Sequence, residues 1–529
     1  MRTLTRHIIP AAFILLFISG CEFEKKFLTV EQIGKATIET FFSELDGLKA
    51  AGEGLHKELR TFVDKDLLRY GDVRGDLLAT TVNTGEGELL AYNYELTAEH
   101  VSTYPRNLWA DGWSVVSSAN YILHYGQKLM DGNRFTLPSE KATMETIFAQ
   151  ARFARAFAHF YLVNCYAWPY NYKADHSQIG IPIMDHVPGF NDKVARRSVA
   201  DVYAFIFSDL EEARKLFASA AERDPASAQT NCQINSISDC YKISDIACEA
   251  LLARINLYIG EWEAAEKHAK AVMDKVPLTP HDRYVDMFRK SQDYHGAEAI
   301  LRMNSLNNTT STASFYDDSR SLGADFVPDA GFKALFDPYD IRASLLTYVP
   351  LPTEECASRG PFNCVCKYLY DRTITDPYKQ VHDCFVLRCS EMYLIHAEAA
   401  VRGRGDVNTA IDDIKALLAR AYNVPVSSVD VQAGSADVVL NLIEMERTKE
   451  LCFEGHRFFD MMRLGKDLNR PSSSTAKLKY LKYPDYRFVL PIDRMECQYN
   501  EAMEQNEGYD DYKTGGPKKG TDSEAENES

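Results

Sequence analysis

The sequence predicts a mostly α-helical protein in which helix pairs form a scaffold and one loop-rich, irregular segment is inserted between them. Three observations support this fold class. Apolar residues recur at intervals of three and four along much of the chain, two stretches have the pattern of paired helices, and residues 278–388 have no helical period. Frequent Pro, Gly, Asn and Asp interrupt the apolar residues in that last stretch.

Two segments of the first half have the pattern of single amphipathic helices. Residues 151–163 and 198–216 each place apolar side chains along one face. Ser198 precedes the second segment, and with Asp201 it resembles a capping box in which Asp replaces the usual Glu or Gln. We therefore expect that helix to begin directly after Ser198.

Residues 243–277 have the pattern of two helices joined at Gly260, a residue that tolerates the left-handed backbone of a helix end. The pattern resembles the tetratricopeptide repeat of about 34 residues. Asn256 departs from it where an aromatic residue is usual. The residues at the expected offsets are Leu252, Ala253, Ala265, Ala269 and Pro277. A second pair is predicted over residues 390–422, where a longer turn leaves a generic helical hairpin open.

The organisation that follows is a single domain, residues 21–529. Its helical scaffold lies mainly in residues 40–277 and 389–465, and the loop-rich insertion is residues 278–388. A structureless loop of this length is usually functional or disordered, and the aromatic residues in it argue against disorder. Residues 508–529 are polar and are expected to form a flexible tail.

The first 20 residues have the features of a signal peptide. Arg2 and Arg6 precede an apolar stretch over residues 8–18, which is too short to span a bilayer as a helix. Small residues then lead into Cys21, as in the lipobox of bacterial lipoproteins, where the cysteine is acylated after cleavage. The alternative is an ordinary buried strand that contains a cysteine. With no apolar run of 18 residues after Cys21, we expect a protein anchored to a membrane by lipid.

Composition excludes several classes of function. The formal net charge is −17, a sign that repels phosphate backbones, and no basic patch offsets it, so nucleic acid is not an expected partner. The sequence contains no H-E-x-x-H, no G-x-S-x-G and no P-loop, and we expect no cofactor. Cys364 and Cys366 lack the second ligand pair of a zinc site, so no metal is expected. A disulfide among Cys232 and Cys240, or among Cys356, Cys364 and Cys366, stays open.

Residues 440–463 carry the densest charge pattern of the chain, and we predict them to be one helix. Arg447, Glu450, Glu454 and Arg457 lie three or four residues apart, which places opposite charges side by side. Catalytic carboxyl pairs face each other across a cleft. Because these carboxylates are interleaved with arginine, we predict structural ion pairs rather than acid–base catalysis.

Candidate ligand-binding residues combine aromatic rings with polar groups, as sugar sites do: rings stack on the C–H faces of sugars, and Asp, Asn and Arg bond to hydroxyls. For Trp109 and Trp113, four residues apart, the alternative is helix packing, and Tyr92 and Tyr94 could equally lie on one face of a strand. The candidates are Asp72, Arg74, Tyr92, Tyr94, Tyr104, Trp109, Phe315 and Tyr316.

Taken in order, short motifs along nearly the whole chain resemble the SusD/RagB family of outer-membrane nutrient-binding lipoproteins. They are Cys21 with Lys26-Phe27-Leu28; Arg74-Gly75-Asp76; Trp113 to Leu123 with Asn120; Ala151 to Ala156 with Phe160-Tyr161-Leu162; Gly180-Ile181-Pro182; Arg197-Ser198-Val199 through Asp209-Leu210-Glu211; Glu391 to Ile395 with Ala397-Glu398-Ala399; Glu450-Leu451, Glu454-Gly455 and Arg457-Phe458; and Leu490-Pro491-Ile492 with Asn506 and Gly508-Tyr509. The chain departs from the family in lacking a Pro-rich segment after Cys21 and in having Asp493-Arg494 after Leu-Pro-Ile.

The resemblance implies four tetratricopeptide-like helix pairs and a loop-built ligand face. It implies a lipid-anchored, outer-membrane protein facing the cell exterior that captures oligosaccharide and delivers it to a TonB-dependent, SusC-like transporter. A peptide-binding transporter lid is the alternative, and a surface glycoside hydrolase is a weaker one, because members of this family are not enzymes. The resemblance carries over a region for the ligand but no individual contact. Aromatic residues without a helical period lie in residues 70–110 and 300–350, and we expect the ligand there.

Overall fold

The structure is a computed structural model. It describes residues 37–100, 106–132, 135–189, 191–225, 239–289, 297–304, 312–316, 323–350, 352, 354, 357–358, 360–369 and 383–509. The predicted anchor Cys21, the predicted ligand residue Tyr104 and most of the predicted tail lie outside these residues.

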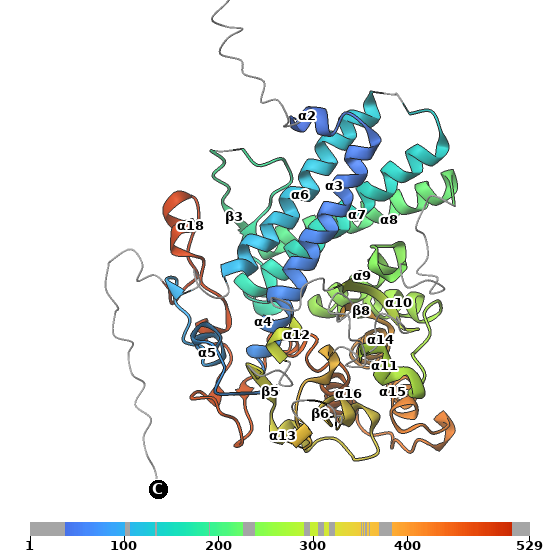
Figure 1. The fold of residues 1–529 in the computed structure, drawn as a ribbon, viewed down its shortest axis with the longest axis vertical. Coiled ribbons are helices and arrows are strands. Elements are labelled where there is room, and N and C mark those ends of the chain that lie inside the picture. The colour runs from blue at the N-terminus through green and yellow to red at the C-terminus, as the bar shows by residue number, and fades with distance from the viewer. Residues whose placement is uncertain are drawn as a thin grey trace, which may run out of the picture.

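Four long helices lie side by side at one end of the molecule (Figure 1). They are α3 (Leu45–Thr61), α6 (Arg106–Asp131), α7 (Pro138–Tyr166) and α8 (Val199–Arg223). Helix α7 is buried along most of its length because α3, α6 and α8 all pack against it. The two predicted single helices are confirmed as parts of α7 and α8. The Ser198 hydroxyl accepts a hydrogen bond from the backbone nitrogen of Asp201 at 3.1 Å, which makes Ser198 the N-cap of α8.

The second group of helices contains both predicted helix pairs. It consists of α9 (Asp245–Ile259), α10 (Trp262–Met273), α14 (Cys389–Arg404), α15 (Val407–Tyr422) and α16 (Ala436–Glu450). Gly260 ends α9 with a φ of 85°, as predicted. Helix α10 packs against α14 although the whole insertion separates them in sequence. The insertion therefore leaves the scaffold after one helix pair and returns directly before the next.

The described residues between 278 and 388 form short helices and strands. Strand β4 pairs with β8 in an antiparallel ladder that ends at the start of α14, and β6 pairs with β7. The elements are α11 (His281–Arg289), β4 (Ala299–Asn304), α12 (Thr312–Tyr316), β5 (Phe326–Pro328), α13 (Ala330–Lys333), η5 (Ile341–Leu345), β6 (Thr347–Tyr348), β7 (Phe362–Asn363), η7 (Cys366–Tyr368) and β8 (Asp383–Arg388).

Short elements also surround the long helices. Strand β1 reaches across the chain to pair with β5, while β2 pairs with β3 and β9 with β10, all antiparallel. These elements are α2 (Ile38–Phe41), η1 (Phe62–Leu67), α4 (Leu68–Val73), β1 (Leu78–Thr80), α5 (Glu86–Tyr92), η3 (Tyr170–Tyr172), β2 (Ile179–Pro182), β3 (Arg196–Ser198), η4 (Asp239–Tyr241), η8 (Val426–Ser428), α17 (Arg457–Arg463), β9 (Leu468–Asn469), β10 (Tyr480–Leu481), η9 (Tyr486–Phe488) and α18 (Arg494–Tyr499).

The prediction of one helix over residues 440–463 is wrong. Helix α16 ends at Glu450, and α17 begins only at Arg457. Gly455 has a φ of 76° between them, in the left-handed region. The break lets this turn approach α4 closely: a Cβ atom on Gly455 would lie 3.0 Å from Cα of Leu68, and one on Gly71 would lie 2.1 Å from the carbonyl oxygen of Gly455. A continuous helix could not make this contact.

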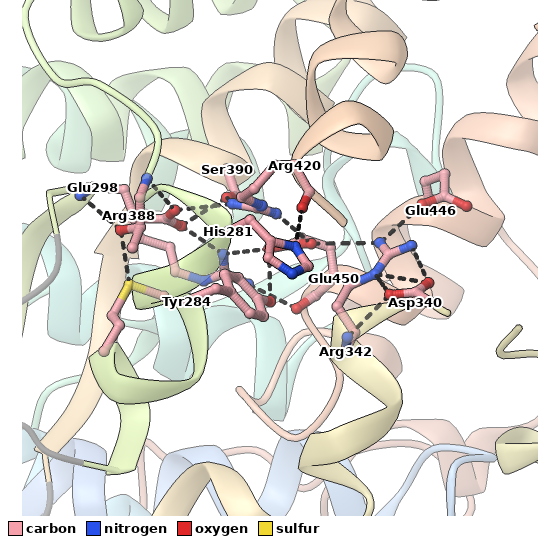
Figure 2. Close-up of polar contacts among 12 residues, drawn as sticks. His281, Tyr284, Glu298, Asp340, Arg342, Arg388, Ser390, Arg420, Glu446 and Glu450 are labelled. Atoms are coloured by element: carbon pink, nitrogen blue, oxygen red, sulfur yellow. Dashed lines mark hydrogen bonds and ion pairs between the residues drawn. The ribbon is translucent and has the colours of Figure 1, made fainter. Parts of the chain in front are cut away.

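Several charged residues of this region pair with distant parts of the chain, although Arg463 and Asp460 pair at i,i+3 on α17. Figure 2 shows Glu450 between Arg342 on one side and Arg388 and Arg420 on the other. Arg388 contacts Glu298 at 2.8 Å and Glu450 at 2.7 Å, and Arg420 contacts Glu450 at 2.7 Å. We call these five buried residues the Glu450 cluster. It ties the insertion to α15 and α16.

Electrostatics in the Glu450 cluster keep its carboxylates ionised. Burial alone would raise the pKa of Glu450, but the positive charges of Arg420, Arg388 and Arg342 outweigh burial and hold this pKa well below its ordinary value. The predicted ion-pair residues Arg447, Glu454 and Arg457 also have partners. Arg447 contacts Asp460 at 2.7 Å, Glu454 contacts Arg388 at 2.8 Å, and Arg457 contacts Asp76 at 2.7 Å.

The structure also bears on cysteine pairing, metal ligands and membrane-spanning helices. Cys240, Cys364 and Cys366 are buried and form no disulfide with one another, whereas Cys232 and Cys356 lie outside the described residues. Within the described ranges, no group of three or more His, Cys, Asp or Glu side chains is placed to hold a metal ion. Nor does any helix there have the length and apolar character needed to cross a membrane.

Candidate functional site

Four predicted ligand residues, Asp72, Arg74, Tyr92 and Tyr94, lie in the core, each no more than 2% exposed. Asp72, on α4, accepts hydrogen bonds from the Tyr316 hydroxyl at 2.9 Å and from the backbone nitrogen of Gly455 at 3.0 Å. Burial raises the pKa of Asp72 to about 8, although both hydrogen bonds oppose the shift. Asp72 therefore joins α4 to the turn that follows α16.

Arg74, Tyr92 and Tyr94 likewise bond to the protein itself. The guanidinium of Arg74 lies 4.0 Å from the centroid of the Tyr94 ring, a cation–π distance. The hydroxyl of Tyr94 donates to the carbonyl oxygen of Arg74 at 2.5 Å, and that of Tyr92 donates to the carbonyl oxygen of Leu78 at 2.7 Å. Together with Phe315 and Tyr316, which are also buried, these residues form a polar and aromatic core that offers no surface to a ligand.

Trp109, by contrast, lines a cavity. It lies on α6 one turn before Trp113, and the two indole rings contact edge to face with centroids 5.3 Å apart. One side of the pair packs on α7, where Trp109 lies 4.7 Å from the Tyr166 ring. Both rings also line a cavity of ≈ 470 Å³, the tryptophan cavity. Packing of this pair on α7 therefore leaves the binding interpretation available.

The other walls of the tryptophan cavity come from two distant segments. Pro182, Met184 and Pro188 lie in β2 and the connection to β3, and Glu496 and Asn500 lie on and directly after α18. The cavity volume is in the range of ligand sites, about 300–1,000 Å³, and aromatic and apolar walls with a few polar groups are typical of such sites.

Glu496 and Asn500 supply polar groups to the cavity. Burial raises the pKa of Glu496, and a hydrogen bond with the Trp109 side chain partly opposes this rise. Because the indole nitrogen is only a donor, the carboxyl group is the acceptor in this bond. Asn500 is held by its Nδ2 atom, which donates to the carbonyl oxygen of Val194 at 3.0 Å. The indole and the carboxyl thus fix each other's position.

Asn120 holds the wall formed by the β2–β3 connection against α6. Its Nδ2 atom donates to the carbonyl oxygens of Met184 at 3.1 Å and His186 at 2.7 Å. Its Oδ1 atom accepts from a guanidinium nitrogen of Arg155 at 2.6 Å. Because Asn120 is 2% exposed, these bonds are shielded from water, and the cavity wall is fixed before any ligand arrives.

Sequence reasoning missed Met184, Glu496 and Asn500 as parts of the site. They lie more than 50 residues from α6 in sequence, and only the packing of β2 and α18 brings them to Trp109. The motif Gly180-Ile181-Pro182 marked the first of these segments without indicating what it contacts.

A smaller cavity of ≈ 360 Å³ between α14, α16 and α17 has mainly charged walls. Its charges pair internally: Arg463 contacts Glu398 at 2.7 Å, and Arg457 contacts Glu444 at 3.3 Å. Such closed ion pairs favour a structural role, and the tryptophan cavity is the better candidate for a binding site.

Two family models match the chain. The model described as "SusD family" matches residues 363–509, and the model described as "Starch-binding associating with outer membrane" matches residues 82–257. The second match contains Trp109, Trp113, Asn120 and Met184, and the first contains Glu496 and Asn500. The two matches together cover more than half of the chain.

Individual relatives agree over most of their length. "SusD-like protein P2" of Formosa agariphila is 21% identical and covers 95% of this chain and 100% of its own. A SusD superfamily protein from Bacteroides vulgatus has a TM-score of 0.71 at 23% identity, covering 88% of this chain and 99% of its own. A putative sugar binding protein from the same species has a TM-score of 0.71 at 22% identity, covering 88% and 98%. These structures share the fold of this chain.

Proposed function

Because the chain belongs to the SusD/RagB family, we propose that it is a cell-surface, nutrient-binding lipoprotein that captures an oligosaccharide and delivers it to a partner TonB-dependent, SusC-like outer-membrane transporter. SusD family proteins are binding proteins without catalytic activity, which confirms that this chain is not an enzyme and removes the glycoside hydrolase alternative.

The observation that carries this proposal is the tryptophan cavity. Its indole rings are suited to the C–H faces of a sugar, and Glu496 and Asn500 are suited to its hydroxyls. The names of relatives agree in ligand class: one matching structure is of a putative sugar binding protein, and another is of a SusD-like carbohydrate binding protein, both from Bacteroides vulgatus. A peptide ligand has no comparable support.

Membrane location rests on two separate observations. The matching family model is described as associating with the outer membrane, and the sequence has a lipobox that ends at Cys21. Acylation of Cys21 would hold the binding domain at the membrane surface, next to a transporter barrel. The strongly acidic chain, with a net charge of −17, suits neutral cargo better than a polyanion at most of its surface.

Binding is tested by screening the mature protein against glycan and peptide arrays and then titrating the best ligand by calorimetry. We expect saturable binding to a glycan, weakened about 10- to 100-fold by Trp109→Ala, since loss of an aromatic anchor in an interface costs about 2 kcal/mol or more. Trp262→Ala is the matched control, because this partly buried tryptophan on α10 lies away from the cavity. Binding only to peptides, or equal effects of the two variants, would contradict the proposal.

The anchor is tested by Cys21→Ala. We expect the variant to keep its circular dichroism spectrum and its glycan affinity but to leave the membrane fraction, because the acyl chains are the proposed attachment. Fractionation of cells that express each form measures this directly. Retention of the variant in the membrane fraction would show that Cys21 is not the anchor.

A further inference from the structure

A second cavity adjoins the tryptophan cavity on the other side of the segment that Asn120 holds. It has a volume of ≈ 450 Å³ and lies over the second half of α6 and the middle of α7. We call it the polar cavity. Asn120 lines both cavities, Met184 and Pro188 line the tryptophan cavity, and Asp185 and His186 line the polar cavity. A chain-like ligand at Trp109 would therefore reach the polar cavity by passing over this segment.

The walls of the polar cavity differ in chemistry from those of the tryptophan cavity. No tryptophan lines it, and three cationic side chains do: Lys128 from α6, and Arg152 and Arg155 from α7. Two carboxylates, Asp131 and Asp185, also line it and accept hydrogen bonds from Gln127 at 2.8 Å and His186 at 2.9 Å. The cationic side chains determine which ligands this cavity favours. The hydrogen bonds that each cation already forms within the protein determine which of them can also bind a ligand.

Arg155 is fully occupied by the protein. Its Nε and one terminal nitrogen donate to the buried carboxylate of Asp209 at 2.7 Å each, and its other terminal nitrogen donates to Asn120. Its charge is therefore balanced by Asp209. Arg152 donates to the same carboxylate through a single nitrogen at 2.8 Å. One aspartate thus pairs with two arginines, so Arg152 shares its counter-ion with Arg155.

Arg152 and Lys128 both have donors to offer. The side chain of Arg152 is 30% exposed, and its Nε and second terminal nitrogen bond to none of the described residues. The ammonium of Lys128 lies 5.0 Å from the centroid of the Tyr125 ring and forms no ion pair within the described part of the chain. A guanidinium and an ammonium, on adjacent helices and both lining one cavity, suit a carboxylate or sulfate oxygen group.

The acidic balance of the whole chain does not oppose an anion here. Charges separated by more than about 8 Å are largely screened at physiological ionic strength, so nearby groups dominate the potential inside the cavity. His186 also lines the polar cavity, and hydrogen bonds of its ring with Asp185 and Asp192 raise its pKa above its ordinary value.

We propose that the polar cavity is a subsite for an anionic substituent, a uronic-acid carboxylate or a sulfate ester, on the same oligosaccharide that binds at Trp109. The inference rests on the proposed function and deepens it: the preferred substrate class is an acidic glycan. The tryptophan cavity binds a sugar ring through apolar contact, and Lys128 with Arg152 selects the chain that has an acidic group beyond that ring.

The experiment uses the mature protein and an array that holds each acidic glycan beside its neutral form. Oligogalacturonates are paired with their methyl esters, and sulfated galactans with their desulfated forms, so that the two arms distinguish carboxylate from sulfate. The tightest ligand is then titrated against the double variant K128Q/R152Q. The control K49Q/K215Q removes the same charge from α3 and α8, at exposed positions that line neither cavity.

We expect the tightest ligand to be acidic and to lose about tenfold or more in affinity on neutralisation, the size of one charge-assisted hydrogen bond. K128Q/R152Q should cause a similar loss for the acidic form, little for the neutral form, and a weaker dependence on salt. A tightest ligand that is neutral, or an acidic ligand that K128Q/R152Q and K49Q/K215Q bind equally well, would overturn the subsite while leaving the proposed function intact. Absence of saturable binding to any glycan would overturn both.

Discussion

The Glu450 cluster and the tryptophan cavity use polar side chains in opposite ways. In the cluster, each carboxylate of Glu298 and Glu450 faces more than one arginine, and all five side chains are buried. In the cavity, Glu496 is only partly buried and bonds to the Trp109 indole on one side, with open volume on the other. A charged or aromatic side chain therefore indicates a binding site only when its contacts within the protein leave part of it accessible to a ligand.

The same contrast explains how far the sequence could predict this protein. Helical periodicity located α7, α8 and both helix pairs, and Gly260 marked a helix end correctly, because these features depend on local residues. The break between α16 and α17 was missed, because it depends on the approach of α4 from a distant part of the chain. The charge pattern of the sequence continues across that break, so this pattern could not reveal where α16 ends.

Site residues were harder to predict for the same physical reason. Asp72, Arg74 and Tyr94 have the composition of a sugar site, yet their hydrogen-bonding groups meet other parts of the core. Trp109 has the same composition signal and does line a cavity. Nothing local separates these cases. The difference lies in whether α18 and the β2–β3 connection leave a space beside the side chain, which depends on tertiary packing.

Removal of one arginine from the Glu450 cluster is expected to cause a large loss of stability. Arg388→Met removes the guanidinium that contacts Glu298, Glu450 and Glu454 and leaves three buried carboxylates short of positive charge. We expect a loss of about 3–5 kcal/mol in the free energy of unfolding, measured by urea denaturation. Arg214→Met is the control, because Arg214 pairs with Glu249 at 2.7 Å but is 37% exposed, and it should cost about 1 kcal/mol or less. Similar losses in the free energy of unfolding for both variants would contradict a larger contribution of the buried cluster than of an exposed ion pair.

A smaller effect tests the turn that positions the cluster. Gly71→Ala would place a Cβ atom 2.1 Å from the carbonyl oxygen of Gly455, so α4 and the turn after α16 would have to separate. We expect a loss of about 1–3 kcal/mol in the free energy of unfolding, as for overpacked cores. Gly54→Ala is the matched control: a Cβ there meets nothing within 4 Å, and Gly54 lies inside α3, so this variant should gain about 0.5–1 kcal/mol. An unchanged stability for Gly71→Ala would refute the close contact.

The last prediction concerns Asp72 and depends on pH. Its pKa of about 8 in the folded chain lies above the value of about 3.9 for an unfolded chain, so the folded state binds more protons between these pH values. The contribution of Asp72 to stability is therefore complete below about pH 4 and is lost as the pH rises through about 8. Asp72→Asn should flatten the fall in stability from pH 5 to pH 9, measured by thermal unfolding. A variant whose stability falls as steeply as that of the natural protein would show that Asp72 is ionised when folded.

The central claim, that a glycan binds in the tryptophan cavity, is tested most directly by a crystal structure of the mature protein with its tightest-binding oligosaccharide. The account predicts a sugar ring against Trp109 and Trp113, between α6 and α18, with hydroxyls within hydrogen-bond distance of Glu496 or Asn500. An oligosaccharide bound at another surface, with the tryptophan cavity empty, would contradict it.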